Sequence, residues 1–335
     1  MPTLYITREN GTLAQSGNAL QWRAAGDKKK TTLPTAQISD VIVVGQGNIT
    51  TQALHLLMDL QIPVHYLTSN GRYKGSLTSG RRHSFQTWNL HYHYASDPEL
   101  SLKVAKNIIT GKILNQRNTL LRYHYRRGMR DDILVETAAE LKDLLTQLSW
   151  CKEIDQVRGV EGIAAKSYFR AFASIIQPPW QFKERNRRPP KDPVNAMLSF
   201  GYTLLLSSVV TAILIAGLDP CVGFVHPEYR GRPSLALDLM EEFRSSVVDR
   251  MVLSACGQML LRPEDFEGRG AEGVVMTADA RKRFLKLYSD RVRTEVQNQG
   301  NNFRTSIENQ IHLQSAFFLR SMRNETDYLP FVMGK

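Results

Sequence analysis

Residues 91–100 read HYHYASDPEL, and the character of the chain changes across this stretch. Before it, short apolar runs such as TLYI, ALQWR and IPVHYL alternate with turn residues, a pattern typical of strands and hairpins. After it, long segments carry apolar residues at helical spacing as far as about residue 319. The chain therefore predicts an α+β fold, with a small N-terminal β domain followed by a larger all-α-helical C-terminal domain.

The Ser, Asp and Pro residues between positions 95 and 98 interrupt regular structure and indicate where the two parts separate. We expect a strand-rich domain over residues 1–94 and a helical domain over residues 95–335. Within the first, the run TTQALHLLMDLQ at residues 50–61 has apolar side chains at helical spacing, which predicts one short helix that crosses the sheet.

The composition is that of an ordinary globular protein, with 335 residues of which 42% are hydrophobic, so a sizeable core is expected. Three cysteines, Cys151, Cys221 and Cys256, have no CxxC spacing, which favours a reducing cytoplasm over a disulfide framework or a thiolate zinc site. The most apolar run, at residues 203–219, is shorter than the ~20 residues of a membrane span. We expect a buried core helix there and no membrane partner.

Positive charge dominates, because 43 Lys and Arg residues face 32 Asp and Glu residues and give a formal net charge of +11. This balance is typical of proteins that bind nucleic acid, although a solvated basic surface is an equally simple interpretation. Residues 101–130 contain no acid at all, and a second basic tract, WQFKERNRRPPKD, spans residues 180–192. From the two tracts we take five candidate DNA-binding residues, namely Arg122, Arg126, Arg127, Arg187 and Arg188.

Acids gather in SLALDLMEEFR at residues 234–244, where Asp238, Glu241 and Glu242 stand at positions i, i+3 and i+4. On a helix these positions share one face, and like charges there repel by a few tenths of a kcal/mol per pair. A bound divalent cation would reverse the sign of that interaction. The alternative is that the acids interact favourably with the helix dipole after a Pro-Ser start.

Two further candidates lie in other segments. His226 ends an apolar run in VGFVHPEY, and Glu161 lies in RGVEGIAAKSYFRAF on a face of small and aromatic residues. A carboxylate is expensive to bury on such a face unless it is paired or bound to metal. One nitrogen and two carboxylate ligands suit Mg²⁺ or Mn²⁺, since these ions prefer oxygen donors with room for water and phosphate. Spacing alone leaves a purely structural role open for each residue.

Four longer sequence blocks resemble those of a known protein family. They are IPVHYLTSNGRYKGSL, RGVEGIAAKSYF, RRPPKDPVNAMLSFGYTLL and GLDPCVGFVHPEYRGRPSLALDLMEEFR. Together with the closing YLPFVMGK, they closely resemble the spacer-acquisition integrases of CRISPR systems, the Cas1 family, over essentially the whole chain.

The resemblance implies an N-terminal β domain that mediates homodimerisation and a helical domain that binds Mg²⁺ or Mn²⁺. By the matching motifs, Glu161, His226 and Glu241 are the catalytic metal ligands, and Asp238 supports them. Some family members carry Asp at the position of Glu241, so the choice between Asp238 and Glu241 as the direct ligand stays open. Asn195 matches a motif position close to the site, with helix N-capping as its alternative role.

The implied activity is a metal-dependent DNA integrase and endonuclease, which joins the 3′-hydroxyl ends of short DNA fragments to CRISPR repeats by transesterification. The implied partners are DNA, as spacer precursor and CRISPR repeat, a second copy of the chain, and a small ferredoxin-like adaptation subunit, Cas2. Two alternatives remain: a structure-selective metal-dependent nuclease of DNA repair, and a non-catalytic DNA-binding scaffold in which the acids only cap helices.

Overall fold

The protein is described from a computed structural model, in which three residues, Gln37, Arg126 and Arg127, are described by their backbone alone. The described residues are 3–6, 11–24, 26, 30–38, 40–68, 73–79, 85–127, 132–186, 189–227, 229–268, 270, 273–300 and 304–334. The chain divides into two compact units, Met1–His83 and Ser84–Lys335.

The first unit contains two four-stranded sheets. One has the order β1-β5-β7-β8, parallel except for β8, and is formed by Leu4–Ile6, Val41–Val44, Val64–Leu67 and Tyr73–Leu77. The other has the order β4-β3-β2-β6 and is formed by Lys30–Leu33, Ala19–Arg23, Thr12–Ser16 and Asn48–Ile49. The chain turns between β2 and β3 at Gly17, whose φ of 59° lies in the left-handed region that glycine tolerates best.

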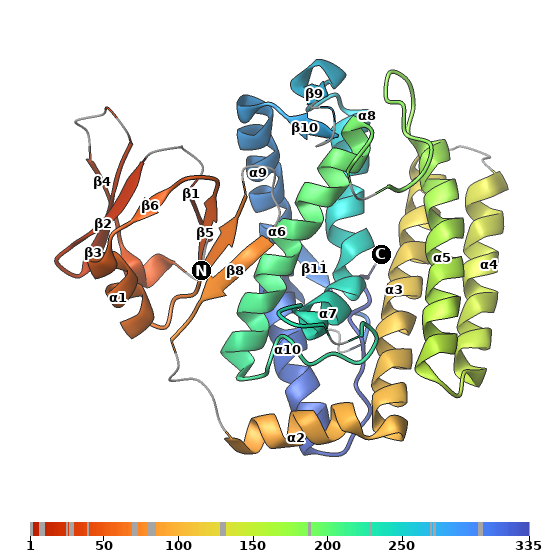
Figure 1. Ribbon diagram of the computed structural model, residues 1–335. Helices are drawn as coiled ribbons and strands as arrows, with labels where there is room; N and C mark the ends of the chain where they lie inside the picture. Colours follow the sequence, from red (N-terminus) through yellow and green to blue (C-terminus); the bar gives the residue numbers. More distant parts are fainter. Residues whose placement is uncertain are drawn as a thin grey trace. The chain divides into compact units, whose positions relative to one another are not determined.

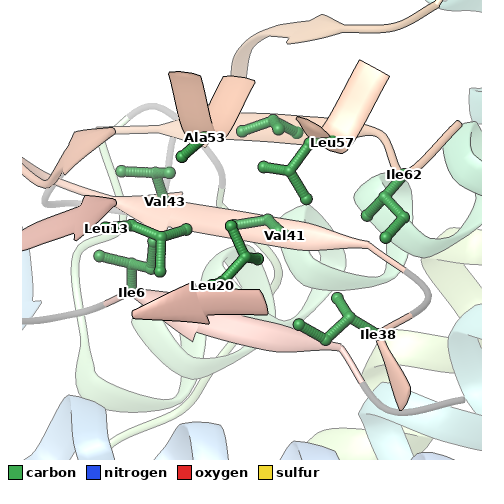
Figure 2. Packing of buried hydrophobic residues seen from close by; sticks show 10 residues of the cluster. Ile6, Leu13, Leu20, Ile38, Val41, Val43, Ala53, Leu57 and Ile62 are labelled. Atoms are coloured by element: carbon green, nitrogen blue, oxygen red, sulfur yellow. The ribbon is translucent and has the colours of Figure 1, made fainter. Parts of the chain in front are cut away.

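The expected short helix is present as α1, Thr51–Asp59. It begins at Thr50, whose hydroxyl accepts a hydrogen bond from the backbone N–H of Ala53 at 3.3 Å. Ala53 and Leu57 of α1 pack with residues of both sheets in one buried cluster, which includes Leu13 of β2 and Val41 of β5 (Figure 2). The first unit therefore has a hydrophobic core of its own.

The second unit is mostly helical (Figure 1). Its helices are α2 Phe85–Ser96, α3 Pro98–Arg127, α4 Asp132–Trp150, α5 Ile154–Ile175, α6 Pro193–Ala216, α7 Ser234–Arg244, a π-helix at Ser245–Asp249, α8 Arg250–Gly257, α9 Ala278–Arg293 and α10 Ile307–Arg323. Two short antiparallel pairs accompany them, β9 Phe266–Gly268 with β10 Val274–Met276, and β11 Glu295–Gln297 with β12 Arg304–Ser306. The predicted α+β fold class is confirmed.

The boundary between the units lies after His83, whereas the sequence pattern placed it between residues 94 and 95, inside α2. Helix α2 belongs to the second unit, where for example the Tyr94 hydroxyl donates to the Met322 carbonyl at 3.2 Å. The polar signals after α2 have a local purpose instead, because the Asp97 side chain accepts from backbone N–H groups at the start of α3. They mark a helix start and not a domain boundary.

The apolar run at residues 203–219 lies mostly in α6, which is buried along most of its length. Among the described residues α6 is the one helix long and apolar enough to cross a membrane, and 72% of its most apolar window is buried inside the protein. It packs against α7 and α10, while α3, α4 and α5 lie side by side (Figure 1). As expected, α6 is a core helix.

Candidate active site

The central charged residues come from three helices, α3, α5 and α7. The ammonium of Lys112 on α3 forms ion pairs with Glu161 Oε1 on α5 and, at 2.7 Å, with Glu241 Oε2 on α7. The Lys112 and Glu241 side chains are buried, whereas Glu161 keeps 27% of its side chain exposed. Two acids singled out from the sequence therefore meet on one cation, although they belong to different helices.

Glu241 is held as a carboxylate by its positive surroundings. Its Oε1 lies 3.1 Å from the Arg244 guanidinium one turn further along α7. Burial alone would raise the pKa of Glu241, but the charges of Arg244 and Lys112 outweigh it and hold the pKa below its ordinary value. The imidazole of His226 contacts Asp238, one turn before Glu241 on α7, so all three predicted residues lie around this helix.

His226 is oriented by Asp238. The buried Asp238 carboxylate accepts from the backbone N–H groups of Phe224, Val225 and His226 at 2.6, 2.9 and 3.0 Å, and contacts His226 Nδ1 at 2.6 Å. Since an ionised carboxylate can only accept, Nδ1 carries the hydrogen, and Nε2 of the neutral ring is left as an acceptor. This is the arrangement found in histidines that bind metal ions.

The loop that carries His226 approaches α7 very closely. A Cβ atom on Gly223 would lie 2.7 Å from Asp238 Oδ2 and 2.8 Å from Ser234 Cβ, so only glycine fits at this position. On its other side the loop is tied to α5, because Arg158 Nε donates to the Val225 carbonyl at 2.6 Å. The loop is therefore fixed to both helices that supply the acids.

Glu242 contacts a different part of the structure from its neighbour Glu241. Its carboxylate accepts from the Tyr328 hydroxyl at 2.7 Å and from the Phe331 N–H at 2.6 Å, both in the C-terminal segment Tyr328–Met333. Burial raises the pKa of Glu242 to about 8, although these two hydrogen bonds act to lower it. Glu242 therefore pairs with the C-terminal segment and does not join Glu161 and Glu241 at the Lys112 ammonium.

Asn195 does not cap α6, because that role belongs to Asp192, whose Oδ1 accepts from the Asn195 N–H at 2.8 Å. The Asn195 Oδ1 instead accepts from Arg185 Nη1 at 2.7 Å. The guanidinium of Arg185 lies 5.5 Å from the centre of the Tyr202 ring, and that of Arg244 lies 4.7 Å from the same ring. Asn195 is therefore linked to the site indirectly, through the second basic tract.

Lys112 is the central residue that sequence reasoning missed. It was one of the basic residues of the acid-free tract, for which contact with phosphates was the expected role. One available signal was its helical neighbourhood, since Ile108, Ile109 and Ile113 are completely buried and place Lys112 on the core side of α3. Its partners could not be found this way, because they lie on other helices.

Of the five candidate DNA-binding arginines, the structure describes the side chain of Arg122 alone. Arg122 is half-buried and lies near Arg250 and Arg291. Burial, together with the charge of Arg122, lowers the pKa of both Arg250 and Arg291 to about 10. Arg187, Arg188 and the side chains of Arg126 and Arg127 lie outside the described residues.

The donor set suits a hard divalent cation, but it is not preassembled around one. Within the part of the chain that the structure describes, no three His, Cys, Asp or Glu side chains are gathered as a metal-binding group. Glu161 and Glu241 nevertheless face one cation already, and Glu241 Oε2 has no hydrogen-bond partner among the described atoms besides its ion pair with Lys112. The chemistry fits Mg²⁺ or Mn²⁺, while Lys112 fills the position between the acids.

Comparisons with known proteins point to one family. The family model described as CRISPR associated protein Cas1 matches residues 4–290. A CRISPR-associated endonuclease Cas1 of Chlorobaculum tepidum is 32% identical over 341 residues, which cover 98% of each chain. One from Thermus thermophilus is 33% identical over 331 residues, which cover 98% of this chain and 94% of the relative.

Solved structures share the fold. A Cas1 protein from Thermotoga maritima has a TM-score of 0.84 at 23% identity, covering 100% of this chain and 99% of its own. A casposase bound to integration product has a TM-score of 0.85 at 23% identity, with 99% and 93% covered. A Cas6-RT-Cas1–Cas2 complex is similar with a TM-score of 0.84 at 25% identity, over 99% of this chain and 36% of the longer one.

Proposed function

This chain belongs to the CRISPR-associated Cas1 family, and on that basis we propose that it inserts short DNA fragments into a CRISPR array. In the proposed reaction the 3′-hydroxyl of a fragment attacks a phosphodiester at the edge of a repeat. A phosphorus–oxygen bond to the fragment forms, and the bond to the 3′-oxygen of the array strand breaks, so the step is a transesterification. With water as the nucleophile, the same site would nick DNA, which is the endonuclease activity named in the relatives.

The observation that carries the proposal is the convergence of Glu161 and Glu241 on one cation beside His226. We assign Glu161, Glu241 and His226 Nε2 as the groups that hold Mg²⁺ or Mn²⁺. A metal ion bound there would supply Lewis-acid activation of the scissile phosphate. The four hydrogen bonds that Asp238 accepts support a role for it in orienting His226, and favour Glu241 as the direct ligand.

The proposed partners follow from charge and from the solved relatives. The net charge of +11 supports DNA as the substrate, in the form of spacer precursor and CRISPR repeat. Similar structures of a casposase bound to integration product and of a Cas6-RT-Cas1–Cas2 complex support DNA and the small ferredoxin-like Cas2 subunit as partners. We propose that a second copy of the chain binds through the β unit. All three cysteines are free, which supports a reducing, cytoplasmic setting.

A joining assay tests the proposal, with purified protein, the Cas2 subunit, a fragment with 3′-hydroxyl ends and supercoiled array DNA. Glu161→Gln and Glu241→Gln should abolish joining while DNA binding stays equal or becomes tighter, because each removes one negative charge near phosphate. Glu140→Gln is the matched control, since Glu140 pairs with Arg170 of α5 away from the cation. Joining at the wild-type rate by both site variants would refute the proposed metal ligands.

The same assay separates the two alternatives. A repair nuclease would hydrolyse branched DNA but would not produce joined strands, so products are resolved by length on denaturing gels. A non-catalytic scaffold would behave identically with and without a chelator. The proposed integrase should lose joining in chelator and regain it when Mg²⁺ or Mn²⁺ is restored.

A further inference from the structure

We infer that Lys112 is a displaceable internal counter-ion, whose ammonium occupies the position between Glu161 and Glu241 and leaves Glu241 when a divalent metal ion binds. This inference rests on the proposed metal role of the two acids. It assigns to Lys112 a positioning task, which is to hold the two carboxylates together in the metal-free protein.

Both oxygens of Glu241 are occupied by cations. Oε1 lies 3.1 Å from the Arg244 guanidinium, and Oε2 lies 2.7 Å from the Lys112 ammonium. A metal ligand must offer at least one oxygen to the ion. A metal ion shared by Glu161 and Glu241 would need the position that the Lys112 ammonium takes between them, whereas Arg244 contacts Glu241 alone.

Lys112 is the side chain that can move away from Glu241. Arg244 lies one turn from Glu241 on the same helix, and its guanidinium is held against the Tyr202 ring at 4.7 Å. Its planar fork is therefore fixed on two sides. Lys112 is a point charge on a flexible four-carbon stem, and its ammonium keeps a second carboxylate partner, Glu161 Oε1, when it leaves Glu241 Oε2.

The backbone that carries Lys112 is fixed, so only the side chain needs to move. Asn115, on the next turn of α3, donates to the carbonyls of Glu242 and Phe331 at 2.8 and 2.7 Å. A Cβ atom on Gly111 would lie 2.5 Å from Pro330 Cβ, so α3 and the C-terminal segment are in close contact here. Rotation about the Lys112 side-chain bonds is thus the local change that opens the position.

Two consequences follow for the metal-free protein. The ammonium stabilises a pair of carboxylates that would otherwise repel each other at close range. It also competes with the metal ion, because only molecules whose acids are free of Lys112 can bind the ion. The apparent metal affinity is the intrinsic affinity multiplied by the fraction of such molecules. If Lys112 occupies the position in at least nine of ten molecules, the reduction is at least about tenfold.

The test compares Lys112→Met with Lys103→Met in the full chain. Lys103 lies on the same helix and pairs with the exposed Asp327, so it controls for the loss of a lysine and of an ion pair. Mn²⁺ binding is measured from the electron paramagnetic resonance signal of the free ion, without any DNA. Lys112→Met should bind Mn²⁺ at least about tenfold more tightly than the wild type, and Lys103→Met should bind as the wild type does.

Glu161→Gln and Glu241→Gln are measured in the same titration, because they separate two kinds of failure. If both bind Mn²⁺ as the wild type does, the proposed metal role is refuted, and the inference on Lys112 falls with it. If both bind more weakly but Lys112→Met binds no more tightly than the wild type, the metal role stands and the inference on Lys112 alone is overturned.

Crystals of the unaltered chain give a second measurement that does not depend on the folding of a variant. With Mn²⁺ bound, the Lys112 ammonium should lie beyond ion-pair distance from Glu241 Oε2, while Arg244 stays beside Oε1. An ammonium that still contacts Oε2 beside the bound ion would overturn the inference.

Discussion

At the scale of single residues, Asp238 acts through the hydrogen bonds it accepts. Asp238→Asn should lower the free energy of unfolding by about 2–4 kcal/mol, because an amide cannot accept from three N–H groups and an imidazole at once. It should also weaken Mn²⁺ binding by about 10–100-fold, since His226 loses its orienting partner. The measurements are urea unfolding and the Mn²⁺ titration.

The matched control is Asp219→Asn, in the same loop. Asp219 accepts from the Cys221 N–H at 2.8 Å and from the Tyr92 hydroxyl at 2.9 Å, and no described contact links it to His226. It should leave Mn²⁺ binding unchanged. Equal effects of the two substitutions on metal binding would remove the orienting role of Asp238.

Asp249 makes a pH-dependent contribution to the free energy of unfolding. Its buried carboxylate accepts from the Tyr202 and Tyr168 hydroxyls at 2.5 and 2.9 Å, yet burial raises its pKa from 3.8 to about 6. The folded protein thus binds this proton more tightly than the unfolded chain, and its stabilising contribution, complete below about pH 4, is lost as the pH rises to about 6. Between pH 4 and pH 7 the wild type should therefore lose about 1–3 kcal/mol of unfolding free energy relative to Asp249→Asn.

Urea unfolding at a series of pH values measures this difference. Asp279→Asn is the control, because a hydrogen bond and the charge of Lys282 lower the pKa of the exposed Asp279. Its difference from the wild type should therefore change with pH in the opposite direction. A difference between Asp249→Asn and the wild type that does not change with pH would contradict the prediction.

At the scale of elements, the C-terminal segment Tyr328–Met333 joins α3 to α7. Asn115 of α3 donates to the Glu242 and Phe331 carbonyls and accepts from the Met333 N–H at 2.9 Å. Asn115→Ala leaves these buried groups unpaired and should lower the free energy of unfolding by about 2–4 kcal/mol. The segment should also become more sensitive to proteolysis.

Asn118 provides the control one turn further along α3, because its amide makes one long contact of 3.4 Å with the Met333 carbonyl. Asn118→Ala should lower the free energy of unfolding by less than about 1 kcal/mol. If the two alanine variants unfold at the same urea concentration, the segment does not depend on Asn115.

Element types were predictable because their signals are local. The apolar spacing at residues 50–61 and the helical period after residue 100 both describe neighbours along the chain, and the structure confirms both helices, although helical structure already begins with α2 at Phe85. Asp97 was misread as a boundary signal, since a helix cap and a linker use the same residue types. The partners of Glu242 were not predictable, because adjacent helical positions differ by about a quarter turn and only tertiary packing decides which one meets the C-terminal segment.

At the scale of the whole molecule, the β unit has its own core and should fold alone. A fragment of residues 1–83 should show strand-rich circular dichroism and self-associate at micromolar concentration, since Leu13, Leu20, Val41 and Leu57 belong to a cluster within that unit. Sedimentation equilibrium measures the association. A folded but monomeric fragment would exclude the β unit as a sufficient dimerisation surface.

The candidate site was predictable only where residues match family motifs. Glu161, His226 and Glu241 came from such blocks, and the structure brings them into one neighbourhood. Lys112 could not be found in this way, because a basic residue in a basic tract looks the same whether it faces a phosphate or a buried acid. Its meaning depends on α5 and α7, which begin far downstream in the chain.

The C-terminal segment has a consequence for the order of events during synthesis. A ribosome releases α3, α5 and α7 well before residues 328–333, so the nascent chain holds the acids and the lysine before it has the residues that clamp α3 onto α7. The contacts that clamp α3 onto α7 can therefore form only after residues 328–333 have left the ribosome.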